Sequence, residues 1–182
     1  MERLKQFFTT IVRRAFWELG LTEQPIVEHV GAVLADFADA NRLYRLRSIE
    51  GKRIDSVAAM MLELPAAAPR TQIERERDLR RYIGDYTLFM SGIFRSHAER
   101  GGYLDYYIET GRRSYWTVSE LDVTLYRTGF MLFQELSRKF EFYSGALDYV
   151  RKAYFAPSPG AEPFADFLRQ VDGWVRTGIS NN

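Results

Sequence analysis

The chain has 182 residues, no cysteine and nearly balanced charge, with 25 lysines and arginines against 24 aspartates and glutamates. A domain of this length buries roughly 70% of its unfolded surface, so one core without disulfides is sufficient. The lack of cysteine excludes thiolate metal sites and a cysteine nucleophile, and it fits a reducing cytoplasm. A net charge near zero provides no general attraction for nucleic acid or for an acidic partner.

Residues 1–20 predict an amphipathic N-terminal helix, because the apolar side chains recur every three or four positions. Trp17 is placed on the polar side of this helix, near Arg13 and Arg14. A tryptophan there either covers the arginine stems or marks a surface for a partner.

The sequence contains no apolar run of about 18 residues, so we expect no transmembrane segment. Arg13 and Arg14 interrupt any secretory signal, which favours a cytoplasmic location. A basic face with a tryptophan is compatible with peripheral membrane contact by residues 1–19, but Glu2 and Glu18 oppose it.

A second helix is expected after Thr22, its predicted N-cap, with Pro25 in the first turn. His29 falls at the edge of the apolar stripe of this helix. We therefore expect a half-exposed histidine at the border of the core.

The segment 42–53 has the strongest local excess of positive charge. It could contact phosphates, but we favour a solvated surface whose arginines pair with acids, and expect only weak, non-specific binding of nucleic acid. The candidate interaction surface combines its basic residues with part of the first helix: Arg13, Arg14, Trp17, Arg42, Arg45, Arg47, Lys52 and Arg53.

A short helix follows from about residue 56 to 64, and residues 65–69 read as a connector. Thr71 and Glu74 form a predicted capping box, which opens the longest periodic stretch of the chain. From Asp78 to Tyr115 the apolar spacing predicts two helices joined by a turn at 101–102, an αα-hairpin at the centre of the fold.

Gly84 is the most informative residue of this hairpin. A glycine inside a helix costs about 1 kcal/mol relative to alanine, so we expect the close approach of a neighbouring helix or of a ligand there, and favour the helix crossing. Asp85, next to it, is either solvated or paired with an arginine such as Arg112 or Arg113, and we favour the pair.

The segment I-G-D-Y-T-L-F-M-S-G-I-F, residues 83–94, resembles an uncharacterised family of small all-helical bacterial proteins; the stretch 106–115 resembles it more loosely. This resemblance implies a bacterial source and an all-helical fold. It implies no activity and no catalytic residues.

Thr117 and Glu120 form a second predicted capping box, opening a central helix that runs to about Lys139. Ser144 is the predicted cap of the next helix. Residues 157–163 read as a loop before a C-terminal helix at 164–178. The whole chain, 1–182, is thus expected to form a single-domain all-α bundle of about seven helices.

Polar aromatic residues gather on the hairpin and define a candidate pocket: Tyr82, Asp85, Tyr86, His97, Tyr106, Tyr107, Arg112 and Tyr115. Buried tyrosines need hydrogen-bond partners, so these residues could line a ligand site. We favour the alternative that they are core residues whose tips reach the surface. For His97 we favour a cap at the C-terminus of a helix.

No motif for a catalytic triad, a phosphate loop, a dinucleotide fold or a di-iron site is present. We therefore expect a protein-interaction or scaffolding protein of the bacterial cytoplasm, acting on a partner protein or as a homo-oligomer, without metal or cofactor. Enzymatic activity is left open but not favoured. The alternative is a helical enzyme, or a protein that binds a small molecule or cofactor, using the hairpin 78–115.

Overall fold

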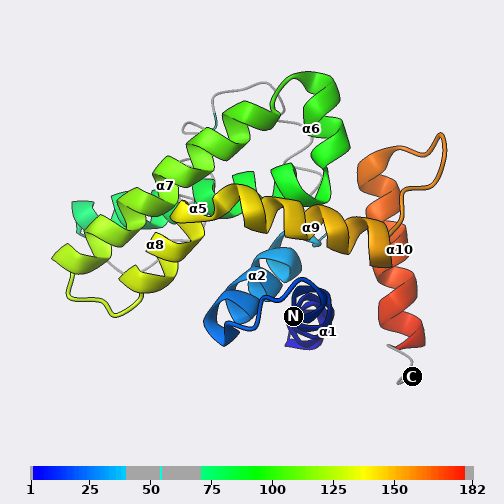
Figure 1. Ribbon diagram of the computed structural model, residues 1–182, viewed down its shortest axis with the longest axis horizontal. Coiled ribbons are helices and arrows are strands. Elements are labelled where there is room, and N and C mark those ends of the chain that lie inside the picture. The colour runs from blue at the N-terminus through cyan, green and yellow to red at the C-terminus, as the bar shows by residue number, and fades with distance from the viewer. Residues whose placement is uncertain (1, 40–53, 55–70, 179–182) are drawn as a thin grey trace.

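The computed structural model describes residues 2–39, 54 and 71–178, and this part of the chain is all-helical, as predicted. Its eight helices pack together as a bundle (Figure 1). They are α1 Glu2–Glu18, α2 Gln24–Phe37, α5 Gln72–Ile93, α6 Arg95–Gly101, α7 Leu104–Thr124, α8 Phe130–Arg138, α9 Phe140–Tyr154 and α10 Pro163–Thr177. The predicted elements at 42–53, 56–64 and 65–69 lie outside the described residues.

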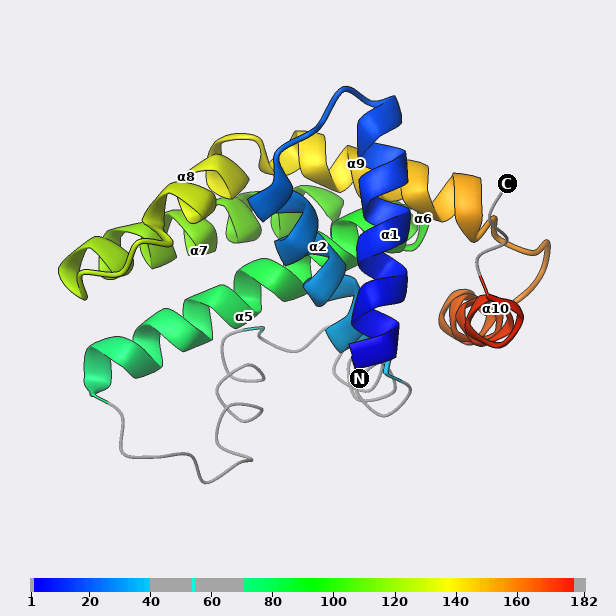
Figure 2. The same cartoon turned by 90° about the horizontal axis from the view of Figure 1, so that it is seen from below.

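The central hairpin is formed by α5 and α7, which lie side by side (Figure 2). The predicted turn is confirmed: Gly102 adopts the left-handed conformation at φ 74°, and its N–H binds the carbonyl groups of Ala98 and Glu99. An additional break occurs at Phe94, with φ −111° and ψ 37°. The short helix α6 therefore stands between the two long helices.

The first capping box is confirmed at the start of α5. The Glu74 N–H donates to Thr71 Oγ1 over 3.2 Å, and the Thr71 N–H donates to Glu74 Oε2 over 3.3 Å. At α2 the predicted cap is wrong, because Glu23 and not Thr22 occupies the N-cap position; Pro25 does lie in the first turn.

The second predicted capping box is also wrong. Thr117 lies inside α7, and its hydroxyl donates to the carbonyl oxygen of Arg113 over 3.0 Å. A threonine within a helix can satisfy its hydroxyl in this way, so the same pattern does not require a helix start. The chain turns between Thr124 and Phe130, and no continuous helix runs from 120 to 139.

Ser144 does not cap a helix either, because it lies buried within α9. Its hydroxyl donates to Ser91 Oγ on α5 over 2.9 Å. Beside this contact, a Cβ added at Gly92 would lie only 2.4 Å from Leu147 Cβ. Small residues on α5 thus let α9 approach closely.

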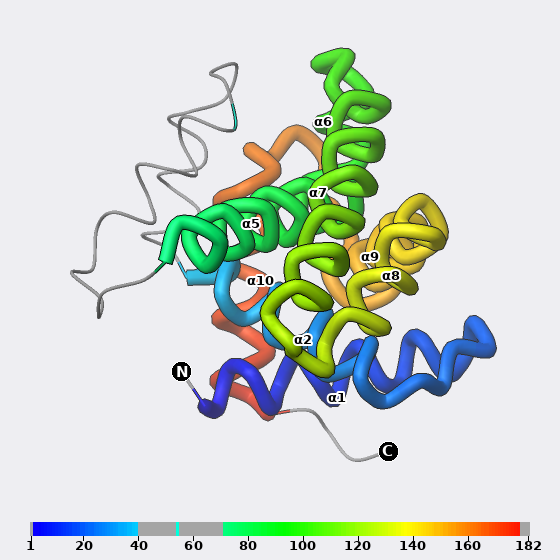
Figure 3. Tube along the Cα trace, turned by 90° about the vertical axis from the view of Figure 1, so that its left-hand side faces the viewer, coloured from blue at the N-terminus to red at the C-terminus, as the bar shows by residue number. Residues whose placement is uncertain are grey.

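The predicted crossing at Gly84 is confirmed, with α7 as the neighbour. A Cβ at position 84 would lie 2.6 Å from Cδ1 of Tyr115, whose side chain is fully buried. The helix α2 lies against α5 of the hairpin, and α1 packs against α2 and α9 (Figure 3). At the other end α10 follows the predicted loop and buries Phe164 and Phe167.

Candidate functional site

A polar cluster joins three helices in the interior. His29 on α2 contacts Asp85 on α5, with 2.9 Å between Nε2 and Oδ1. The Tyr115 hydroxyl on α7 donates to the same Oδ1 over 2.6 Å. His29 is only 7% exposed, so the predicted half-exposed position is wrong. The edge of α2 that carries His29 is covered by Tyr115 and by Phe133 of α8, at ring-centroid distances of 6.0 and 5.5 Å.

The charge on Asp85 is stabilised despite its surroundings. Burial alone would raise the pKa of this carboxyl, but the charge and hydrogen bond of His29, the charge of Arg81 and the Tyr115 hydrogen bond together lower it. Burial and the Asp85 carboxylate raise the pKa of Tyr115 well above its usual value, so Tyr115 stays protonated and donates. The cluster acts as a hydrogen-bonded joint between α2, α5 and α7.

Asp85 does pair with an arginine, as expected, but this arginine is Arg81 on the same helix, with 3.7 Å between Nε and Oδ2, and not Arg112 or Arg113. Arg113 points outward and pairs with Glu109 on the same helix, with 3.4 Å between Nε and Oε1. Arg112 has a buried Nε atom without a hydrogen-bond partner. His29 and Tyr115 reach Asp85 from α2 and α7, and sequence spacing along the hairpin does not show the contact with His29.

A second buried ion pair ties the start of α5 to the end of α7. The Arg77 Nε donates to Asp122 Oδ1 over 2.8 Å, and its Nη2 donates to Oδ2 over 3.4 Å. The guanidinium also stands over the Phe133 ring, 5.4 Å from the centroid. Burial opposes the charge of Arg77, but Asp122 outweighs it and the pKa of Arg77 is raised.

This pair is not evident from the sequence, because Arg77 belongs to a run of alternating charges that is typical of an exposed helix. A usable signal is the position of Asp122, four residues after Val118 and seven after Tyr115. If α7 is allowed to continue past Thr117, Asp122 falls on its buried stripe.

The pair Arg77–Asp122 supports an exposed apolar corner, which we call the α7–α8 corner: residues 123–131, with the side chains of Val123, Tyr126 and Met131 (lower left in Figure 1). The Arg127 N–H donates to the carbonyl oxygen of Asp122 over 2.8 Å. Tyr126 has φ 55°, and the residue is 96% exposed. Val123 is 55% and Met131 68% exposed.

The eight residues of the predicted pocket fall into separate environments. Asp85 and Tyr115 belong to the polar cluster. The buried rings of Tyr86 and Tyr107 contact each other, with 5.9 Å between their centroids. Two more tyrosines adjoin this pair: Tyr106, half exposed, contacts Tyr107, and Tyr82 contacts Phe37, as Tyr86 does. Arg112 on α7 and His97 on α6 lie apart from them. A ligand at the tyrosines therefore stays a prediction.

His97 does not cap the long helix, because the break at Phe94 places it within α6. Its ring packs edge-to-face against the Phe164 ring, with 5.3 Å between the two centroids. It lines a cavity of about 440 Å³ between α6, α9 and the loop 157–163.

Three members of the predicted interaction surface, Arg13, Arg14 and Trp17, are exposed on α1, with Trp17 72% exposed. The other members lie outside the described residues: Arg42, Arg45, Arg47, Lys52 and Arg53. Whether these eight residues act together stays a prediction.

Within residues 2–39, 54 and 71–178 no cluster of three or more histidine or acidic side chains is arranged to hold a metal ion. None of the described helices is both long and apolar enough to cross a membrane. A scan against protein-family models and searches of curated proteins and of solved structures returned no match. The resemblance of segment 83–94 to a family of small helical proteins thus stays a prediction, and function is inferred from geometry.

Proposed function

We propose that this chain is a non-enzymatic interaction protein of the bacterial cytoplasm that binds a partner protein through the α7–α8 corner. The observation that carries the proposal is Tyr126, a tyrosine in the left-handed region that is 96% exposed. The left-handed conformation costs an L-residue roughly 1–2 kcal/mol. An exposed ring contributes no burial in return, so the fold alone does not explain a tyrosine here.

The residues of the corner suit a protein interface. Tyrosine, methionine and arginine are enriched at contact surfaces, and a few such side chains carry most of the binding free energy. Tyr126 and Met131 supply apolar area, and the neighbouring exposed Arg127 supplies a positive charge. We infer a partner with an apolar depression and an acidic rim.

The corner is also held in place before a partner arrives. The buried pair Arg77–Asp122 fixes the end of α7, and the Arg127 N–H is bound to the Asp122 carbonyl group. A preformed surface loses less conformational entropy on binding. Such a corner enters the apolar depression of the partner without changing its own shape.

Site-specific cross-linking tests this proposal. A photo-reactive phenylalanine analogue at position 126 should yield one discrete cross-linked product in the source cells. The matched control is position 106, since Tyr106 is a half-exposed tyrosine at the other end of α7. Cross-links between copies of this chain would identify a homo-oligomer. Equal, diffuse labelling at both positions would contradict the proposal.

The variant Tyr126→Gly separates binding from stability. Glycine adopts positive φ without steric cost, so we expect the free energy of unfolding to stay unchanged or to rise by up to about 1 kcal/mol. Binding of the partner identified by cross-linking should fall at least tenfold. Denaturant melts and a titration with that partner measure the two effects. A variant that loses stability, or keeps its affinity, would show that Tyr126 serves the fold.

A further inference from the structure

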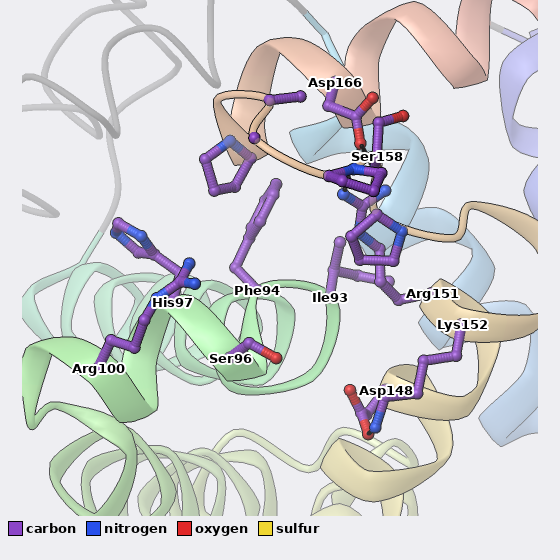
Figure 4. A pocket seen from close by; sticks show the side chains of 15 residues that line it. Ile93, Phe94, Ser96, His97, Arg100, Asp148, Arg151, Lys152, Ser158 and Asp166 are labelled. Atoms are coloured by element: carbon purple, nitrogen blue, oxygen red, sulfur yellow. Dashed lines mark hydrogen bonds and ion pairs between the residues drawn. The ribbon is translucent and has the colours of Figure 1, made fainter.

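The cavity beside His97 has the properties of a small-molecule site. It lies between α6, α9 and the loop 157–163, and its volume of about 440 Å³ falls in the usual range for ligand sites, roughly 300–1,000 Å³. Figure 4 shows side chains of α6 and α9 on opposite sides, with the loop above them. It involves no residue of the α7–α8 corner.

The floor of the cavity is aromatic and rigid. Phe94, which is 3% exposed, stacks on Phe164 with 4.3 Å between ring centroids and 30° between their planes. The loop above contributes Pro157 and Pro159 to the lining. Because proline fixes its own φ angle, this part of the loop has little freedom. Phe94 and the two prolines thus form an apolar part of the cavity wall, which we call the slot.

Buried ionic contacts anchor the roof of the slot. Asp166 accepts a hydrogen bond from the Ser158 N–H over 2.9 Å and lies 3.4 Å from Arg151 Nη2. Arg151 also donates to the Phe155 carbonyl oxygen over 2.6 Å. Burial would raise the pKa of Asp166, but the Ser158 hydrogen bonds, Gln170 and Arg151 lower it to about 2. The loop is therefore held in shape without a ligand.

Among the residues that the structure describes, one cation at the rim has no acidic partner. Lys152 is paired with Asp148 over 2.6 Å, and Arg151 is paired with Asp166. Arg100 is exposed, lines the cavity and forms no ion pair with any described residue. A guanidinium presents several N–H donors in one plane, which suits a carboxylate or a phosphate.

We propose that this cavity binds a small organic anion, whose flat apolar body lies on Phe94 beneath the prolines and whose carboxylate or phosphate is held by Arg100. A neutral molecule of the same shape leaves the guanidinium without its partner. An inorganic anion leaves the aromatic floor uncovered. Both parts of the ligand are needed for affinity.

Four probes separate these contributions: benzoate, phenyl phosphate, neutral benzamide and inorganic phosphate. Titration calorimetry on the full chain should show at least one aromatic anion binding about tenfold or more tightly than benzamide and inorganic phosphate. The preferred aromatic anion tells a carboxylate ligand from a phosphate ligand. If neither aromatic anion binds, or benzamide binds equally well, the proposal is wrong.

The histidines locate the bound probe, because the chain has only two. The imidazole NMR signals of His97, which lines the cavity, should shift on binding, whereas those of His29 in the polar cluster should not. A shift of His29 alone would place the ligand elsewhere and overturn the assignment.

The variant Arg100→Gln should weaken the preferred aromatic anion about tenfold and leave benzamide unaffected. Arg113→Gln is the matched control, since this arginine is 73% exposed on α7 and pairs only with Glu109 among the described residues. Both variants should melt like the parent protein, because both side chains lie at the surface. Unchanged affinity in Arg100→Gln would overturn the role of this residue.

Discussion

Replacing Gly84 by leucine is expected to lower the free energy of unfolding by about 3 kcal/mol, through overpacking against Tyr115. Even a Cβ atom at this position would lie 2.6 Å from two carbon atoms of the Tyr115 ring. The ring cannot move aside easily, because it is fully buried and its hydroxyl donates to Asp85. For a chain of this length we expect the melting temperature to fall by roughly 6–12 °C.

Gly145→Leu is the matched control for this change. Gly145 also lies within a helix, α9, but no atom lies within 4 Å of an added Cβ. There the better helix propensity of leucine should stabilise the protein by up to about 1 kcal/mol. Opposite shifts of the two variants in denaturant melts would support the crossing at Gly84. A Gly84→Leu variant that melts like the parent would mean that α5 and α7 do not meet there.

The close approach at Gly84 could be predicted from the sequence because the cost of a helical glycine is local. The identity of the neighbour could not, since Tyr115 follows thirty-one positions later and many aromatic residues could have filled the gap. Each residue of segment 83–85 has a role in the packed interior. Ile83 is buried, Gly84 makes room for the Tyr115 ring, and Asp85 accepts its hydroxyl proton in a hydrogen bond.

The two predicted capping boxes show when a local sequence pattern suffices to predict the start of a helix. Thr71 and Glu74 form the predicted capping box, whereas Thr117 and Glu120, with the same spacing, lie within α7. The two cases differ in what precedes them. The helical spacing of α7 already runs from Leu104 through Val118, and packing against α5 favours continuing it over starting a new helix.

The residues of the candidate sites were harder to predict, because each depends on contacts between distant helices. His29 lies at the edge of its stripe, and an edge position is buried or exposed according to which helix covers it. Tyr126 carries no sequence signal for positive φ, since tyrosine rarely adopts it. The slot beside His97 forms only where the loop 157–163 folds over α6, and no periodicity encodes that contact.

The variant Asp85→Asn is expected to lower the free energy of unfolding by about 2 kcal/mol near neutral pH. Asparagine keeps the shape of the side chain but loses the charge that His29 and Tyr115 bind in this nearly enclosed site. Tyr115→Phe should cost less, about 1 kcal/mol, because the ring and its packing remain. The surface pair Asp172–Arg176, with 58% and 77% of the side chains exposed, supplies the control: Asp172→Asn should change stability by less than about 0.5 kcal/mol.

The pH dependence of the Asp85→Asn effect tests the charge itself. Because the pKa of Asp85 is lowered in the folded protein, its carboxylate stabilises the fold above the unfolded pKa of about 3.9. That contribution is lost as pH falls through the lower, folded value. The difference in unfolding free energy between parent and Asp85→Asn should thus be largest above about pH 4 and shrink steadily below it. Urea melts at a series of pH values measure this difference. A gap that stays constant down to low pH would show that asparagine disturbs packing and that the charge of Asp85 contributes nothing.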